Sequence, residues 1–476
     1  MFAGIVVARI VGPEVIGTLS YGMAYVSLFS IVMGIFGTPH IKLVSEGKPI
    51  DKCIGTYYTL QFGSIFFYFM LTFGWFFIQK YILKVQFENN IIEVVIIVYI
   101  FKKALDKILI VSEDTFLAKM QQFKSNLPKL IMELLYHPGR IVIVLLGYRA
   151  ITLASWDLLT TILVLPIVYK LLKRIGNFKY DKLLVKEYFK YAFPIALYMV
   201  LGILISQGDK LLLHFYTSTK ELGYYSSAYS IGGFVLLLGN SVGQIFFPLF
   251  SDLITKNDWL TINDKIQKFH KLILVFILPS VCLIALFSEQ LVTIFLGAQY
   301  QPSSIPFSII AISSFFFIWF MPYGSVITGK GKFYLYALIS GIKLLLFSFS
   351  ITLLISPDFL NLGAIGVALN TLFMTFTEGG LYIYFSKRIG EINVNKIYLF
   401  VNFIIVCIVL VLFVIITFFN VYTNFIWLFI FLGFPGLIYL LLFKMKIFNY
   451  AYVKDSLNQF KPLLLKNYIK KEFKEK

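Results

Sequence analysis

The stretch from Glu187 to Ile231 reads EYFKYAFPIALYMVLGILISQGDKLLLHFYTSTKELGYYSSAYSI, and it decides how the chain is organised. A basic approach leads into a Pro-broken apolar segment that carries Asp209 and Lys210 in apolar surroundings. A turn from Glu221 to Gly223 then opens the next apolar segment. A similar stretch, ARIVGPEVIGTLSYGMAYVS, stands at the start of the chain from Ala8 to Ser27. This echo predicts a protein built from two similar halves.

The composition identifies an integral membrane protein. Hydrophobic residues make up 59% of the chain and charged residues 14%, whereas soluble domains carry about 25% charged residues. The net charge of +18 lies in short clusters between apolar runs. Such clusters are typical of orientation signals and of contact with anionic membrane lipids, and we expect no nucleic-acid partner. The three cysteines and four histidines are scattered, so we expect no disulfide, no metal site and no cofactor.

Apolar runs long enough to cross a bilayer recur along the whole chain. A spanning helix needs roughly 20 residues, whereas strands of a membrane barrel are about 10 residues long and alternate in polarity. We therefore predict an all-α polytopic membrane protein with spans at 18–37, 54–79, 91–112, 127–147, 150–170, 190–213, 223–250, 271–296, 303–328, 333–356, 361–386, 397–419 and 423–443. A shorter run at 2–8 is interpreted as the end of a first helix that is largely missing, which gives 14 helices in all.

The basic loop residues separate into two sets. Alternate loops and the Lys-rich tail hold most of them, beginning with Lys42, Lys48 and Lys52. The intervening loops hold only a few: Arg9, Lys80, Lys84, Arg149 and Lys220. The positive-inside rule places the first set, and with it both termini, in the cytoplasm.

An internal repeat accounts for the two halves. Gly17 aligns with Gly223, and Ser20 aligns with Ser226 at the same offset. Six helices per repeat is an even number, so the two repeats insert with the same polarity. We predict two parallel six-helix lobes plus two C-terminal helices, divided as follows: an N-lobe at 1–173, a basic cytoplasmic linker at 174–189, a C-lobe at 190–388, helices 13 and 14 at 389–446, and a basic cytoplasmic tail at 447–476.

Several motifs, by their order and spacing, resemble the polysaccharide (Wzx-type) flippase family, which is grouped with the multidrug (MATE) exporters and the lipid II flippase. The N-terminal motif comprises Ala8, Arg9, Gly12, Pro13 and Gly17. The later motifs are Pro194 with Asp209-Lys210-Leu211-Leu212, then Glu221-x-Gly223-Tyr224-Tyr225-Ser226-x-Ala228-Tyr229, then Leu362-Gly363-Ala364-x-Gly366-x-Ala368. The chain departs from the family in lacking most of the first helix.

The resemblance implies a function and a location. A family member moves an undecaprenyl-diphosphate-linked oligosaccharide from the cytoplasmic to the outer leaflet of the bacterial cell membrane, for O-antigen, capsule or exopolysaccharide assembly. A polysaccharide polymerase and a chain-length regulator are then the expected protein partners, and membrane lipids surround the chain. Structural roles are expected for the motif residues Arg9, Gly12, Pro13, Gly17, Asp209 and Gly223.

Ionisable residues inside the predicted spans are candidates for the transport site, because such groups are costly in lipid and usually face a cavity. A lipid diphosphate is anionic, so the cations Arg140, Lys343, Lys103 and Lys107 are expected to contact it. Asp106, Glu133 and Glu378 are the carboxylates available for ion or proton coupling. In the alternative interpretation, Lys102 with Asp106, and Glu133 with Arg140, neutralise each other and only hold helices together.

Two other functions are considered. A MATE-like multidrug or cation exporter would need carboxylates in its cavity, whereas the predicted spans carry an excess of basic residues. A membrane enzyme, such as an oligosaccharide polymerase or glycosyltransferase, would need catalytic groups on a sizeable outer loop, and every predicted outer loop is short. The expected function is therefore transport and not catalysis.

Overall fold

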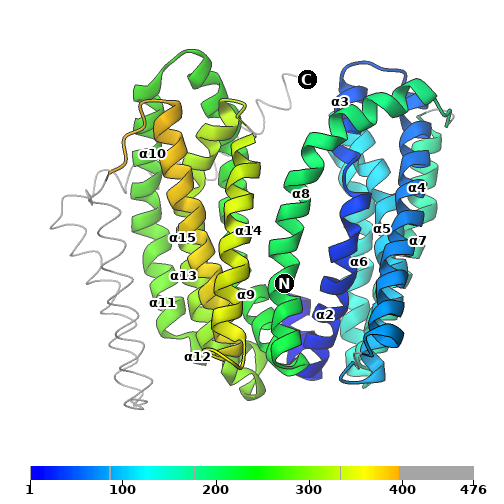
Figure 1. Cartoon of the computed structure of the whole chain (residues 1–476), viewed down its shortest axis with the longest axis vertical. Helices are drawn as coiled ribbons and strands as arrows, with labels where there is room; N and C mark the ends of the chain where they lie inside the picture. The colour runs from blue at the N-terminus through cyan, green and yellow to red at the C-terminus, as the bar shows by residue number, and fades with distance from the viewer. Residues whose placement is uncertain (1, 85–86, 176–177, 333, 396–476) are drawn as a thin grey trace, which may run out of the picture. The chain divides into compact units, whose positions relative to one another are not determined.

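The computed structural model describes residues 2–84, 87–175, 178–332 and 334–395, and within this part every regular element is helical (Figure 1). The first half contains α1 (Phe2–Val11), α2 (Pro13–Phe29), α3 (Gly37–Ser45), α4 (Ile50–Phe77), α5 (Asn90–Ala118), α6 (Gln122–Leu145) and α7 (Ala150–Lys173). The second half contains α8 (Lys182–Tyr216), α9 (Thr219–Thr255), α10 (Trp259–Leu272), α11 (Leu278–Leu286), α12 (Ser288–Leu296), α13 (Ser304–Gly329), α14 (Tyr334–Ile355) and α15 (Gly363–Ile389). Short 3-10 or π segments are η1 (Ser30–Met33), η2 (Ile78–Ile82), η3 (Ile273–Ile277) and η4 (Ala298–Ser303). The predicted all-α fold is confirmed, and the predicted spans 397–419 and 423–443 and the tail lie outside the described residues.

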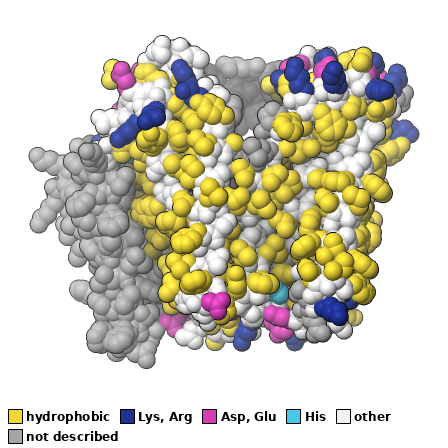
Figure 2. All heavy atoms as spheres, viewed as in Figure 1, with side chains coloured by type: hydrophobic (Ala, Val, Ile, Leu, Met, Phe, Trp, Pro, Cys, Tyr) yellow, Lys and Arg dark blue, Asp and Glu magenta, His cyan; other side chains and the backbone are white. Residues whose placement is uncertain are grey.

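The helices have the length and surface of membrane spans. Six of the described helical segments are long and apolar enough to cross a bilayer by length and composition alone. Figure 2 shows hydrophobic side chains over the middle of the helices and charged side chains at their ends. Large aromatic side chains such as Phe66 and Phe193 are exposed there. An exposed apolar belt is stable in lipid and would aggregate in water, so this surface is that of a multi-pass membrane protein.

Two compact units are distinguished by their internal contacts. The first comprises Met1–Phe234, Ser288–Ser313 and Gly331–Leu381, and the second comprises Val235–Phe287, Ser314–Lys330 and Tyr382–Lys476. In the first unit, α5 packs against α2, α6 and α7, while α8 packs against α2 and α14. In the second unit, His270 of α10 stacks on Trp319 of α13 with ring centroids 3.8 Å apart.

Two predicted segment boundaries are corrected by the structure. The predicted span 271–296 is instead a span from Trp259 to Leu286 followed by the separate helix α12, because the helical run breaks at Phe287 and α12 ends at Gly297 with a φ of 96°. The predicted linker 174–189 is helical from Lys182 onward. Asp181 starts α8 early by accepting a hydrogen bond from the Leu183 N–H at 2.9 Å. At about 1.5 Å per residue, the 35-residue α8 is longer than a bilayer core is thick.

The break between α1 and α2 is built from the Gly-Pro pair of the N-terminal motif. Gly12 has a φ of 83°, which is in the left-handed region that favours glycine. Pro13 follows at the first helical position, where its missing N–H costs no helical hydrogen bond. The Gly-Pro pair thus places the start of α2 at the end of the first unit where α5, α7 and α9 also begin. We call it the Glu88 end.

At the Glu88 end, α2 and α9 cross with their backbones in contact. A Cβ atom on Gly17 would lie 1.8 Å from the carbonyl oxygen of Thr219, and one on Gly223 would lie 1.8 Å from the carbonyl oxygen of Pro13. Pro13 and Thr219 each precede the glycine of their own helix by one turn. The contact is therefore reciprocal, and it joins positions that the internal repeat relates. Only glycine allows so close an approach at these two positions.

Candidate functional site

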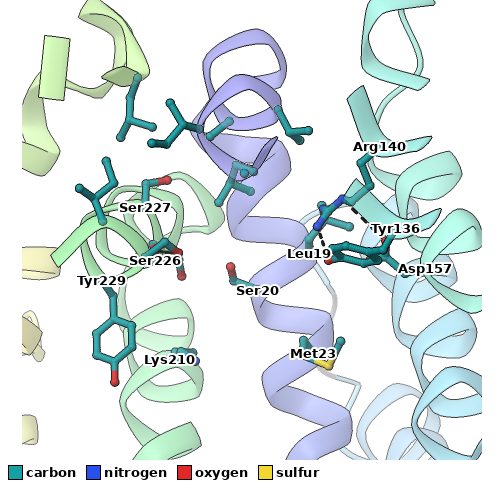
Figure 3. Close-up of a pocket in the computed structure, with 18 of the residues that line it drawn as sticks. Leu19, Ser20, Met23, Tyr136, Arg140, Asp157, Lys210, Ser226, Ser227 and Tyr229 are labelled. Atoms are coloured by element: carbon teal, nitrogen blue, oxygen red, sulfur yellow. Dashed lines mark hydrogen bonds and ion pairs between the residues drawn. The ribbon is translucent and has the colours of Figure 1, made fainter. Parts of the chain in front are cut away.

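A cavity of about 350 Å³ opens inside the first unit among α1, α2, α5, α6, α7, α8 and α9 (Figure 3). One wall carries Arg140, Tyr136 and Asp157, and the opposite wall carries Lys210, Ser226 and Tyr229, with α2 between them. The cavity thus combines apolar surface with a few converging polar groups, which is the usual make-up of a ligand site.

Arg140 is held by one partner on its own helix and one on α7, and the partner on α7 is held in turn by α5. Its guanidinium donates to the Tyr136 hydroxyl one turn earlier on α6, and its Nε lies 3.7 Å from Asp157 Oδ1 on α7. The Tyr99 hydroxyl of α5 donates to the other Asp157 oxygen at 3.0 Å. Asp157 is 2% exposed, so a charged partner is needed to stabilise its carboxylate. Asp157 therefore anchors Arg140 in the cavity wall.

Some polar groups of this cavity have unused hydrogen-bonding capacity. Arg140 Nε, Asp157 Oδ1 and the Ser226 hydroxyl are buried without a hydrogen-bond partner among the described residues. Buried polar groups in proteins are normally paired, so unpaired ones need an explanation such as water or a ligand. Arg140 Nε and Asp157 Oδ1 face each other as an ion pair at 3.7 Å, so of the three groups the Ser226 hydroxyl is the one left for water or a ligand in this cavity.

Three lysines of α5, Lys102, Lys103 and Lys107, lie within two helical turns of each other. Lys102 forms an ion pair with Asp106 at 2.7 Å, as the alternative interpretation predicted, and the second Asp106 oxygen accepts from Thr161 at 3.0 Å. Lys103 and Lys107 make no hydrogen bond or ion pair within the described part of the chain. Lys103 is close enough to Lys210 of α8 for the two charges to repel each other. Asp106 acts electrostatically on both lysines and Asp114 acts on Lys107, but neither carboxylate is in direct contact with them.

Lys107 points toward the turn after η1 and toward α8. Its Nζ lies 3.9 Å from the Cβ position of Gly34, and Met199 of α8 lies 2.8 Å from the same point. The lysine therefore sits where α5, η1 and α8 approach one another. An unpaired ammonium is tolerated there only if water or an anion reaches it.

The remaining predicted residues form ion pairs elsewhere. Lys343 of α14 is bound to Glu378 of α15 at 2.6 Å. Glu133 pairs with His137 at 2.8 Å, so the predicted pairing of Glu133 with Arg140 is wrong, because Asp157 of α7 takes Arg140 instead. Each of the three carboxylates predicted for coupling, Asp106, Glu133 and Glu378, thus has a basic partner.

Motif residues of the N-terminal stretch join α1 to α12 and η4. Arg9 donates to the Ile294 carbonyl at 2.7 Å, Gln299 donates to the Arg9 carbonyl at 2.7 Å, and Tyr300 donates to the Ala8 carbonyl at 3.0 Å. These bonds fix the helix end that precedes Gly12. Of the five residues of this motif, Ala8 alone lines the cavity of Figure 3.

Glu88 ties the turn between α8 and α9 to the loop before α5. Its carboxylate accepts from the Thr219 N–H at 3.0 Å and from the Thr219 hydroxyl, and His214 Nε2 lies 3.8 Å away. His214 also stacks on Tyr21 of α2 at 3.8 Å. Together with the Gly17–Gly223 crossing, these contacts close the Glu88 end.

The structure brings together only part of the predicted set. Arg140 lines the cavity, Lys103 and Lys107 lie on the neighbouring α5, and Lys343 lines a second cavity that also contains Lys210. Asp209 lines that second cavity as well. Asp157 was not among the predicted residues, although it lies inside the predicted span 150–170 and meets the same criterion. Tyr99 and Tyr136 could not be singled out as site residues from the sequence, because the chain contains 30 tyrosines.

One family model matches the sequence over residues 6–305, and its description is "Polysaccharide biosynthesis protein". The chain belongs to this polysaccharide biosynthesis protein family. The match confirms the family to which the sequence motifs pointed. No curated protein sequence shows significant similarity to the chain.

Solved structures resemble this polysaccharide biosynthesis protein in fold. The lipid II flippase MurJ in an inward closed conformation aligns with a TM-score of 0.72 and 16% identity, covering 93% of this chain and 95% of that chain. An inward-facing multidrug resistance MATE family transporter of the MOP superfamily aligns with a TM-score of 0.63 and 11% identity over 82% and 94%. The Vibrio cholerae MATE transporter VcmN aligns with a TM-score of 0.52 and 12% identity over 80% and 96%. At these identities the likeness establishes the fold.

Proposed function

We propose that this protein is a flippase that moves undecaprenyl-diphosphate-linked oligosaccharides from the cytoplasmic to the outer leaflet of a bacterial cell membrane. The product would feed the assembly of a surface polysaccharide such as O-antigen, capsule or exopolysaccharide. Transport and not catalysis is proposed, with both termini cytoplasmic. The polymerase and the chain-length regulator of such a pathway are the proposed protein partners.

The observation that carries the proposal is a group of lysines on α5 and α8, in or beside the cavity, that form no salt bridge with a described residue. Lys103 and Lys107 lie on α5 with Asp106 and Asp114 near enough to act on them electrostatically, and Lys210 faces the cavity from α8. Cations bind a diphosphate through short, charge-assisted hydrogen bonds that are strong in a low-dielectric site. A cationic drug would instead be repelled from this region.

Access to the cavity supports transport by alternating access. The Glu88 end is closed by the reciprocal glycine crossing and by the Glu88–Thr219 bonds. We propose that the substrate enters from the opposite end, and that the crossing separates when it leaves. Proteins of this fold that consist of two parallel repeats can rock one repeat against the other around a fixed site.

The test is reconstituted transport of a fluorescent polyprenyl-diphosphate disaccharide in liposomes, followed by quenching of the label in the outer leaflet. The double substitution Lys103→Gln with Lys107→Gln removes charge-assisted contacts of about 1.5–3 kcal/mol each. We expect the rate at subsaturating substrate to fall at least tenfold.

A charge-matched control is available where α5 ends and α6 begins. Lys119→Gln with Lys124→Gln removes the same charge from exposed positions and should leave the rate within twofold. Equal rates for the wild type and the Lys103/Lys107 variant would exclude the cationic site. Transport of a cationic dye, without transport of the lipid diphosphate, would identify a MATE-like exporter instead.

A further inference from the structure

A second cavity, of about 250 Å³, lies among α8, α9, α14 and α15 of the first unit. It shares Lys210 and Tyr229 with the cavity of Figure 3, so the two cavities meet at these side chains. Lys210 Nζ lies 5.9 Å from the centre of the Tyr229 ring. A ligand whose anionic part is bound by Lys210 would therefore extend into the second cavity.

The charges around the second cavity balance. Asp209 and Lys210 contribute one charge of each sign, and the ammonium of Lys343 is neutralised by Glu378 at 2.6 Å. With two cationic and two anionic side chains, the cavity offers no net charge that would attract either a diphosphate or a metal cation. The electrostatics therefore favour an uncharged ligand.

The polar groups of this cavity are held in place, but their hydrogen-bonding capacity is not used up. Asp209 Oδ2 accepts from the Tyr225 hydroxyl at 2.8 Å, and its Oδ1 accepts from the Lys210 N–H at 2.7 Å. Asn370 Oδ1 accepts from the Ser350 hydroxyl at 2.6 Å. A carboxylate has about four lone-pair sites, and an amide has two N–H donors. The Asn370 amide nitrogen donates to no residue of the described chain. Both groups remain able to bind hydroxyls of a ligand.

The other walls are aromatic or apolar. Tyr229 is 38% exposed and presents its ring, while Phe347 and Met374 close the far side. A pyranose ring carries hydroxyl groups around its rim and C–H groups on its faces. It therefore matches a cavity with fixed acceptors and donors on its sides and an aromatic face beside them.

We propose that the second cavity binds a sugar ring of the oligosaccharide, next to the diphosphate, with Asp209, Asn370 and Tyr229 as the contacts that select it. The proposal rests on the proposed flippase function. A site that hydrogen-bonds a ligand hydroxyl discriminates strongly against a ligand that lacks it, because the protein groups are then buried unpaired. The cavity thus determines which sugar is accepted, while the lysines of α5 and α8 bind the part common to all such lipids.

The test compares two lipids in the liposome assay: polyprenyl diphosphate carrying the oligosaccharide, and polyprenyl diphosphate without sugar. Asp209→Asn keeps the size of the side chain and a contact for Tyr225, and Asn370→Ala removes the amide; neither of these residues lines the cavity of Figure 3. We expect each to raise the KM for the sugar-bearing lipid about tenfold and to leave the sugar-free lipid within twofold. Equal effects on both lipids, or none, would overturn the proposal.

Lys103→Gln with Lys107→Gln should slow transport of both lipids to the same extent. If neither lipid is transported by the wild type, the flippase proposal fails. If both are transported but the cavity variants do not distinguish them, only the sugar site fails. If Asp209→Asn abolishes a sodium dependence equally for both lipids, the cavity holds a cation and the proposal is wrong.

A labelling experiment does not depend on these variants. Ser206 is exposed and lines the cavity, so Ser206→Cys in an otherwise cysteine-free chain reports on its occupancy. We expect the sugar-bearing lipid to slow thiol labelling at least fivefold relative to the sugar-free lipid. Equal labelling rates with the two lipids would contradict occupancy by sugar.

Discussion

His40 is enclosed by four helices at the end of the first unit opposite to Glu88. Its Nδ1 lies 2.6 Å from the Tyr188 hydroxyl of α8, its Nε2 lies 2.8 Å from the Thr115 hydroxyl of α5, and its ring stacks on Tyr57 of α4. The side chain is fully buried and belongs to α3, outside the membrane-spanning segments. Burial lowers the pKa of His40 to about 3.

The lowered pKa of His40 predicts a loss of stability in acid. Because the folded protein keeps the imidazole neutral, the stabilisation is complete above pH 6.5, where the unfolded chain is neutral too. It falls between pH 6.5 and about pH 3, by up to about 1.4 kcal/mol per pH unit. We expect the thermal midpoint in detergent to decrease over this range in the wild type.

His40→Gln should make this dependence less steep, because buried His270 remains. His137→Gln, at a partly exposed position, should leave the dependence as in the wild type. A wild-type midpoint that is constant from pH 6.5 to pH 4 would show that His40 is not held neutral.

At the residue scale, sequence spacing predicts partners on the same helix and misses partners on others. The pair of Lys102 with Asp106 follows from their separation of one helical turn. Arg140 and Asp157 lie on α6 and α7, and Lys343 and Glu378 lie on α14 and α15, so only packing brings them together. For the same reason the sequence could not show that Lys103 and Lys107 form no direct ion pair within the described part of the chain.

In the proposed alternating access, the crossing of α2 and α9 is the element that must open. Gly17→Ala and Gly223→Ala each place a methyl group 1.8 Å from a carbonyl oxygen of the other helix, so the helices must separate. We expect each substitution to speed labelling of Ser226→Cys from the Glu88 end by about tenfold, measured with an impermeant thiol reagent in a cysteine-free chain.

Gly63 of α4 serves as the control, because a Cβ atom there meets nothing within 4 Å. Gly63→Ala should therefore label like the parent. Unchanged labelling in both crossing variants would mean that this contact does not limit access.

At the element scale, the sequence predicts helices well and their ends less well. Gly12 and Pro13 mark the start of α2 because their backbone chemistry is local. The predicted span 271–296 passes over the break at Phe287, although the polar residues Ser288, Glu289 and Gln290 follow it directly and mark the start of α12. The early start of α8 depends on Asp181, a capping residue inside a stretch of lysines that otherwise suggests a loop.

Orientation in the membrane is tested at the scale of the whole molecule. Lys119 and Arg149 are exposed at opposite ends of α6, so cysteines at these positions report on opposite sides of the membrane. The positive-inside rule predicts that Arg149→Cys reacts with an impermeant maleimide in intact bacterial cells. Lys119→Cys should react only after the membrane is permeabilised, and the reverse pattern would contradict the proposed orientation.

The fold class was predictable because composition and run length determine it. A chain with 59% hydrophobic residues in repeated runs is not compatible with a soluble fold. Over runs of this length in lipid, only helices satisfy all hydrogen-bonding groups of the backbone. The cavities were not predictable, since each is made by side chains from helices far apart in the sequence, such as Arg140 and Lys210.

The reciprocal contact of Gly17 with Thr219 and of Gly223 with Pro13 has the geometry of a two-fold dimer interface. In such an interface one surface patch meets a copy of itself, so a single patch is sufficient to form it. Here the two copies are parts of one chain. A six-helix protein with one Pro-x-x-x-Gly helix start could therefore form the same crossing by pairing with a second molecule. Joining the two copies in one chain leaves each glycine free to change without its counterpart, so the two halves of the crossing can diverge.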